Sequence, residues 1–202
     1  MTAKPRGRPR SFDRDAALDQ AIKAFWEHGY EATSVADLTR AMGIGAPSLY
    51  AAFGDKKALF EEAVRTYVER YGGFIGRALA EEPTARAALA RALREAAEEY
   101  TRPGRPHGCL VISATAPADT ATDVAASLAA MREHNVGLFE SRIRADIAAG
   151  VLPPDTDAAA LARFTGAVIQ GMSQQSRDGV GRAELEAVAE AAMRAWPPET
   201  RK

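Results

Sequence analysis

The sequence predicts an all-α protein, and three observations carry that prediction. Hydrophobic residues make up 47% of the 202-residue chain but aromatic residues only 7%, and alanine is abundant, a profile that favours packed helices over sheets. Apolar residues recur at helical spacing, and no stretch alternates like a strand. Gly, Pro and Asp separate the periodic stretches, where helices end and begin. We expect about nine helices.

The first three helices are short and closely spaced. The pattern predicts helices over 13–29, 33–43 and 47–54. An aspartate starts the first, a Thr-Ser pair starts the second, and a proline lies in the first turn of the third. Each of the three ends at a glycine, which is the preferred residue just past a helix C-terminus.

Five longer helices and one short helix, over 109–116, follow in the remainder of the chain. They are expected over 55–79, 83–100, 109–116, 119–150, 155–172 and 182–196. The first of these contains Gly72, Gly73 and Gly76, which can bend it. No fixed-period repeat interrupts the series.

Composition and motifs exclude several classes of protein. No run of eighteen apolar residues occurs and the N-terminus has no apolar segment behind its charges, so we expect no membrane span, no signal peptide and a cytoplasmic location. Cys109 is the only cysteine, which excludes an internal disulfide. The sequence has no GxSxG, HExxH or GxxxxGK[ST] motif, so an enzyme is a remote alternative and no cofactor is implied.

Two short helices joined by GIGA, with a helix before them, match the helix-turn-helix geometry in which the second short helix enters the major groove of DNA. This second helix is only about two turns long, so Leu49 and Phe53 must anchor its inner face. Tyr50 then faces outward, and Lys56 begins the next helix, where a phosphate would suit its charge. Taken singly, Tyr50 is also compatible with half-buried packing and Lys56 with a solvated charge.

Together these residues resemble a known signature. The run HGYEATSVADLTRAMGIGAPSLYAAFGDKKALF looks like the DNA-binding domain of the TetR/AcrR family of regulators, and the helix layout extends the resemblance over the whole chain. The sequence departs from the family pattern at Gly45, where a serine is usual, and at Ala52, where a histidine is frequent. The resemblance implies phosphate contacts by Thr33, Ser34, Tyr50 and Lys56, and base-edge contacts by Ala46, Pro47 and Ser48.

The basic N-terminus is a second candidate for DNA contact. Arg6, Arg8 and Arg10 lie in a ten-residue end without acidic residues. They resemble arms that reach into the minor groove, although such a tail is also compatible with a solvated, disordered end. The resemblance thus divides the chain into an arm (1–12), a three-helix helix-turn-helix DNA-binding domain (13–57) and a larger helical domain for effector binding and dimerisation (58–202).

The family resemblance also implies a dimer and an effector pocket. The last two helices would pair with their copies in a second subunit. The apolar residues along one side of each helix could instead pack in the core of a monomer. The proposed interface residues are Leu161, Phe164, Val168, Met172, Leu185, Val188, Ala192 and Trp196. The candidate pocket residues, each of which could instead be ordinary core, are Phe74, Tyr100, Cys109, Leu110, Met131 and Phe139.

The sequence therefore predicts a homodimeric repressor of a palindromic double-stranded DNA operator, released by an unknown small-molecule effector. A second hypothesis is that Cys109, at a helix start, senses electrophiles or oxidants, whereas a lone cysteine is also compatible with a small buried hydrophobe. The chain also resembles a subgroup with a repressor of a copper-inducible outer-membrane protein. His107 and Cys109 supply only two soft ligands, so no metal site is expected.

Overall fold

A computed structural model describes residues 12–114 and 122–200 of the chain. Within these residues the chain forms ten helices and no strand, which confirms the all-α prediction. The helices are α1 (Arg14–Ala32), α2 (Val35–Met42), α3 (Ala46–Phe53), α4 (Lys56–Tyr71), α5 (Gly73–Glu81), α6 (Ala85–Tyr100), α7 (Leu110–Ser113), α8 (Thr122–Ala148), α9 (Ala158–Arg177) and α10 (Arg182–Arg194).

One predicted helix is divided in two, which accounts for the tenth helix. The expected helix over 55–79 is broken into α4 and α5 at Gly72. A Cβ atom added at Gly72 would lie 2.8 Å from the carbonyl oxygen of Val68, so a larger residue does not fit the bend. The start of the predicted helix at 119 lies outside the described residues.

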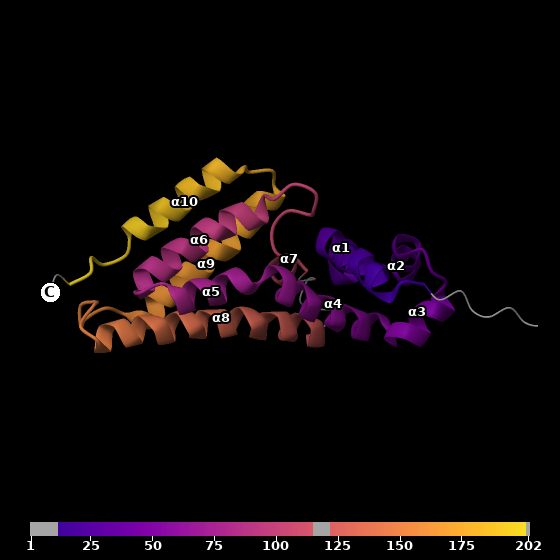
Figure 1. The fold of residues 1–202 in the computed structure, drawn as a ribbon, viewed down its shortest axis with the longest axis horizontal. Coiled ribbons are helices and arrows are strands. Elements are labelled where there is room, and N and C mark those ends of the chain that lie inside the picture. Colours follow the sequence, from indigo (N-terminus) through magenta and orange to yellow (C-terminus); the bar gives the residue numbers. More distant parts are fainter. Residues whose placement is uncertain (1–11, 115–121, 201–202) are drawn as a thin grey trace, which may run out of the picture.

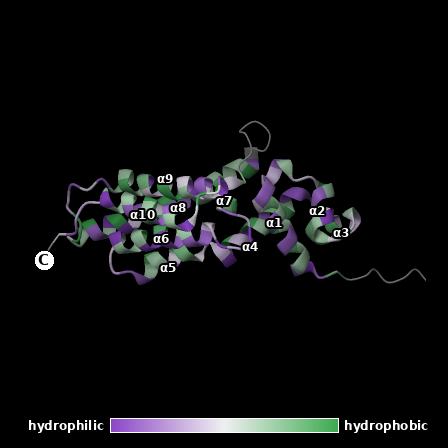
Figure 2. Ribbon diagram, turned by 90° about the horizontal axis from the view of Figure 1, so that it is seen from above, coloured by the Kyte–Doolittle hydropathy of each residue, from purple (hydrophilic) through white to green (hydrophobic). Residues whose placement is uncertain are grey.

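The molecule is elongated, with α1, α2 and α3 at one end and the C-terminal end of the chain at the other (Figure 1). Helix α4 runs from α3 towards the middle, and α8 extends along the length of the larger part, where it packs against α9 and α6, while α10 lies on the other side of these two helices. Hydrophobic and hydrophilic residues are mixed along each helix (Figure 2), as expected for helices that bury only one face.

Two hydrophobic clusters form the core. The first joins α1 to α4 with α7 and the start of α8, and Phe25, Trp26 and Leu49 are among its fully or almost fully buried side chains. The second joins α5, α6, α9 and α10 with the rest of α8. Cys109 packs against both clusters, so it lies where the two parts of the molecule meet.

Candidate DNA-reading surface and effector cavity

The helix-turn-helix is held together by its own caps and by two buried anchors. The Ser34 hydroxyl accepts from the backbone N–H of Asp37, whose carboxylate in turn accepts from the Ser34 N–H, forming a capping box at the start of α2. Helix α3 has Gly45 as its N-cap, without a side-chain hydrogen bond. Leu49 and Phe53 are buried, at 0% and 5% exposed, which confirms them as the anchors of α3.

The outer face of α3 is not covered by the rest of the described chain. Tyr50 is 50% exposed, the largest exposure among the large hydrophobic side chains of the described residues. Pro47 is exposed, and Ala46 and Ser48 are partly exposed on the same short helix. An exposed aromatic ring among small residues leaves the backbone of α3 free to approach a partner closely.

The predicted phosphate-binding residues differ in how they are placed. Ser34 is exposed at the start of α2, and its hydroxyl donates a hydrogen bond to the Asp37 carboxylate at 2.5 Å. The Lys56 ammonium lies 4.3 Å from the centre of the Tyr30 ring, a cation–π contact that fixes its position. Thr33 is fully buried, and its hydroxyl donates to the carbonyl oxygen of Gly29 at 2.6 Å. Its side chain therefore stabilises the turn and is not presented to a phosphate.

The arginines of the predicted arm, Arg6, Arg8 and Arg10, lie outside the described residues. The first basic residue with a described position is Arg14, at the start of α1. Its guanidinium pairs with Glu62 of α4 at 2.6 Å and lies 4.4 Å from the centre of the Phe53 ring. Arg14 thus fixes the relative position of α1, the end of α3 and α4. The guanidinium holds the pKa of the Glu62 carboxyl below its ordinary value.

A cavity of about 430 Å³ lies in the larger part of the molecule, between the two clusters. This volume is in the range of small-molecule sites. Five of the six predicted pocket residues line the cavity, namely Phe74, Tyr100, Cys109, Met131 and Phe139. The sixth, Leu110, does not line the cavity and is fully buried in the first cluster.

Sequence reasoning missed the polar residues of the cavity wall. These are Tyr67 and Tyr71 of α4, Ser127, Arg132, His134 and Asn135 of α8, and Gln170 of α9. They were missed because polar residues on helices are usually assigned to the solvent face. One signal in the sequence was Arg132. It lies within one helical turn of Leu128, Met131 and Val136, which are on the apolar side of α8.

Cys109 lies in the cavity wall beside two tyrosines. Burial raises the pKa of its thiol, and hydrogen bonding to Tyr67 and to nearby backbone groups lowers it by less. Burial also raises the pKa of both Tyr67 and Tyr100 well above the ordinary value, with the neighbouring Cys109 as the next cause. The backbone N–H of Cys109 donates to the Ser173 hydroxyl of α9 at 2.9 Å. The thiol is therefore predominantly protonated at neutral pH.

The cavity wall is in direct contact with α1, which together with α2 and α3 forms the DNA-reading part of the molecule. The Trp26 ring of α1 packs edge-on against Tyr67, with 4.8 Å between ring centres, and lies 5.6 Å from Tyr71. The Arg105 guanidinium lies 4.9 Å from the centre of the Tyr71 ring and 5.7 Å from that of Trp26. Aromatic contacts thus connect the cavity wall on α4 with the core of α1.

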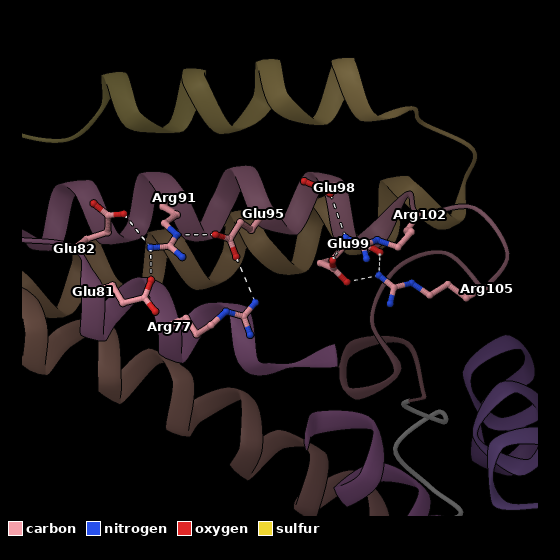
Figure 3. A network of polar contacts seen from close by, with 9 residues as sticks. All are labelled: Arg77, Glu81, Glu82, Arg91, Glu95, Glu98, Glu99, Arg102 and Arg105. Atoms are coloured by element: carbon pink, nitrogen blue, oxygen red, sulfur yellow. Dashed lines mark hydrogen bonds and ion pairs between the residues drawn. The ribbon is translucent and has the colours of Figure 1, made fainter. Parts of the chain in front are cut away.

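Ion pairs hold the segment that carries Arg105. Figure 3 shows a series of carboxylates and guanidinium groups along α6, from the end of α5 to the segment after α6. Arg91 pairs with Glu95 at 2.6 Å, and Arg102 and Arg105 both pair with Glu99. Farther along the chain, Arg177 at the end of α9 donates to the carbonyl oxygens of Trp26 and Glu27 at 2.9 and 3.0 Å.

The predicted dimer residues fall into two groups. Phe164 is 37% exposed, and Leu161, Val168 and Val188 are partly exposed. The other four are buried within the protomer, at 1%, 0%, 6% and 5% exposed: Met172, Leu185, Ala192 and Trp196. These four side chains belong to the protomer's own core, where α10 packs against α6 and α9, and their part in a dimer interface stays a prediction.

Residues 12–114 and 122–200 hold no group of three or more His, Cys, Asp or Glu side chains placed around a common point where a metal ion would fit. The Nδ1 atom of His107 lies 3.2 Å from the carbonyl oxygen of Ser176. No helix in that part of the chain combines the length and apolar character needed to cross a bilayer.

The all-helical fold, the exposed face of α3 and the cavity define a class of protein. It is a helix-turn-helix regulator whose larger domain has a ligand-sized cavity. Family models agree, matching residues 17–63 to bacterial regulatory proteins of the tetR family and residues 83–195 to a tetracyclin repressor-like C-terminal domain. The chain belongs to the TetR family of transcriptional regulators.

Curated relatives and solved structures extend over nearly the whole chain. It is 40% identical over 199 residues to the transcriptional repressor ComR of Escherichia coli K12 (96% of this chain and 93% of ComR) and 32% identical to the repressor BdcR of the same strain (91% and 88%). A cysteine mutant of the TetR-family regulator CifR, complexed with 26-base-pair operator DNA, superposes with a TM-score of 0.89 at 45% identity, covering 95% of this chain and 100% of that one. The copper-related subgroup resemblance stays a prediction.

Proposed function

We propose that this regulator is a homodimeric repressor that binds a palindromic operator and is released when a small molecule enters the cavity. The observation that carries the proposal is the exposed outer face of α3, on which Tyr50 is half exposed; α3 lies at one end of the molecule (Figure 1). The complex of the similar regulator CifR with operator DNA supports it. Binding to chromosomal DNA would place its action in the cytoplasm.

The proposed DNA contacts follow from the placement of each residue. Ala46, Pro47 and Ser48 meet base edges in the major groove, where small side chains let α3 lie deep. Tyr50, Ser34 and Lys56 contact phosphates, which position the reader without specifying sequence. The arm arginines Arg6, Arg8 and Arg10 add minor-groove contacts. Thr33 is left out because its side chain is fully buried, whereas Ser34 is exposed.

The proposed dimer uses the partly exposed residues of α9 and α10. Phe164 is the anchor, with Leu161, Val168 and Val188 beside it, and small residues between them allow close helix packing. A two-fold dimer places two readers about 34 Å apart, one turn of the DNA helix, which is the spacing of a palindromic site. In this proposal the residues 1–12, 13–57 and 58–202 act as arm, reader and effector-binding dimerisation domain.

Release follows from contacts that differ between two states. A ligand in the cavity lies against Tyr67 and Tyr71, which pack on Trp26 of α1. If the ligand binds better to an arrangement in which α4 and α1 are shifted, it lowers operator affinity by that difference in binding free energy. Typical coupling of about 1–3 kcal/mol would weaken operator binding by about 5- to 150-fold.

The test is operator binding by purified full-length variants. An operator would be selected from random duplexes, and affinity measured by fluorescence anisotropy. Tyr50→Ala and Lys56→Ala should each weaken binding about tenfold, since each removes a contact worth about 1–2 kcal/mol, with the dimer intact by size-exclusion chromatography. Arg144→Ala is the control, because Arg144 pairs only with Glu140 of its own helix. Unchanged operator affinity of both Tyr50→Ala and Lys56→Ala would refute the proposed contacts.

A second candidate function is thiol-based sensing of electrophiles, favoured by the position of Cys109 in the cavity wall. The raised pKa of the thiol weighs against fast reaction with oxidants at neutral pH, because the thiolate is the reactive form. We expect iodoacetamide to alkylate Cys109 more slowly at pH 7 than it alkylates a free thiol, followed by mass spectrometry. Electrophile-induced operator release that persists in Cys109→Ser would eliminate this mechanism.

The enzyme alternative is favoured by no observation on the described residues. Family membership makes the chain a regulatory protein, and the lack of catalytic activity stays a prediction.

A further inference from the structure

The cavity wall holds the guanidinium of Arg132, which makes no ion pair with any described residue and feels the adjacent Glu133 only at a distance. Among its lining residues there is no Asp or Glu, whereas Arg132 of α8 contributes a guanidinium and His134 an imidazole. Most of the remaining wall is aliphatic or aromatic. A cation in an otherwise apolar site is costly unless it is paired, so the wall is complementary to a ligand with an anionic group.

Arg132 is fixed in the wall without an acidic partner in the described part of the chain. One of its amino groups donates to the carbonyl oxygen of Val111 in α7, at 2.8 Å, which orients the guanidinium and leaves other N–H groups for a ligand. The adjacent Glu133 pairs with Arg163 of α9 instead, at 2.5 Å, and that pair is exposed. The helix thus turns its acid outward and its arginine towards the cavity.

Cys109 does not serve as the missing anion. Its thiol is close enough for the charge of Arg132 to lower its pKa, but burial is the larger effect and raises that pKa overall. The neighbouring phenols are more weakly acidic still, because burial raises the pKa of Tyr67 and Tyr100. All three groups are therefore neutral at pH 7, and they are available as hydrogen-bond partners rather than as counter-ions.

We propose that the effector is an apolar carboxylate whose acid group pairs with Arg132 and whose hydrocarbon part fills the space lined by Phe74, Phe139 and Ile169. The inference rests on the proposed function of this cavity as the effector site. A guanidinium binds a carboxylate through two parallel hydrogen bonds, and the described residues use only one amino group of Arg132, at Val111. Asn135 and Gln170, also in the wall, add neutral donors.

Matched acids and alcohols test the charge requirement. Isothermal titration calorimetry of the full-length protein would compare octanoate with octanol and phenylbutyrate with phenylbutanol, pairs that differ only in the acid group. Each acid should bind at least about tenfold more tightly than its alcohol if a charged hydrogen-bonded pair forms. Equal affinities within both pairs, or no binding of either acid, would overturn the proposal.

Variants assign the preference to one side chain. Arg132→Met should remove the preference for the acid and leave alcohol binding in place, whereas Arg132→Lys should keep part of it because it keeps a positive charge. Arg144→Met, at an exposed and ion-paired arginine of the same helix, is the matched control and should behave like the wild type. Thermal melts would verify that each variant is folded. An acid preference that persists in folded Arg132→Met would also overturn the proposal.

Operator release is measured separately, by anisotropy, with the same compounds. If octanoate binds in an Arg132-dependent way but the operator is never released, the cavity chemistry stands and the proposed effector function fails. If neutral compounds release the operator and the acids have no advantage, the proposed function stands and the carboxylate assignment fails.

Discussion

Replacing Gly108 by alanine tests how closely the segment between α6 and α7 approaches α9. Gly108 precedes Cys109 and has φ of +77°, a left-handed conformation that costs an L-residue about 1–2 kcal/mol. An added Cβ atom would lie 2.7 Å from the carbonyl oxygen of Ser173 and 3.0 Å from Cγ of Arg177. Since the nearest atom is backbone, the segment or α9 must move.

Gly104, in the same segment, supplies a control with the same backbone cost. Its φ is +84°, but a Cβ atom added there would meet nothing within 4 Å. The difference in the free energy of unfolding between the two alanine variants therefore isolates two contributions. The steric contact costs about 1–3 kcal/mol. The hydrogen bond from the Cys109 N–H to Ser173 is worth about 1 kcal/mol.

The expected effect is a lower melting temperature for Gly108→Ala than for Gly104→Ala. An excess of about 2–4 kcal/mol corresponds to roughly 5–15 °C in a chain of this size, at about 2–4 °C per kcal/mol. Circular dichroism melts of both variants and the wild type would measure it. Equal melting temperatures of the two variants would show that the segment does not press against α9 as described.

Two further predictions concern the contacts between α1 and its neighbours. Because Arg14 holds the pKa of Glu62 below its ordinary value, the pair stabilises the fold above about pH 4.5 and this stabilisation is lost as the pH falls through the lowered pKa. Glu62→Gln should therefore reduce the loss of urea stability between pH 5 and pH 3 by up to about 1 kcal/mol, and an unchanged pH profile would contradict the assignment. Arg177→Gln removes two hydrogen bonds to carbonyl oxygens of α1 and should speed amide exchange in that helix about 5- to 30-fold, for a loss of about 1–2 kcal/mol, whereas the Arg144→Gln control should not. Identical exchange in the two variants would argue against this contact.

The sequence was sufficient to predict the DNA-reading part because its signals are local. The caps, the glycines and the proline of α2 and α3 lie within a few residues of the helix ends that they specify. The anchors Leu49 and Phe53 follow from the period of one short helix. The break between α4 and α5 depended instead on how closely Gly72 approaches Val68, which the presence of glycines suggests but does not decide.

The larger domain was predicted less accurately because an amphipathic stripe does not reveal its partner. The residues of α10 were assigned to a second subunit, yet Leu185 is fully buried against the protomer's own helices. Apolar residues of the cavity were found by the same periodicity that finds a core. Arg132 was missed, because its role depends on the tertiary placement of Val111 and on the absence of an acidic partner among the described residues.

The position of Arg132 and that of the aromatic contacts together constrain how an effector acts. The tyrosines in contact with α1 are on α4, whereas Arg132 is on α8, so they form different parts of the same wall. A ligand bound to Arg132 alone would favour one arrangement of α4 and α1 only by changing the contact of Arg132 with Val111 of α7, because equal affinity for two states shifts neither. In the proposed mechanism, DNA is released when the ligand's apolar part displaces Tyr67 or Tyr71, which pack against Trp26. In this arrangement the charge selects the ligand and its hydrocarbon part supplies the coupling, so affinity and release are separable properties of one cavity.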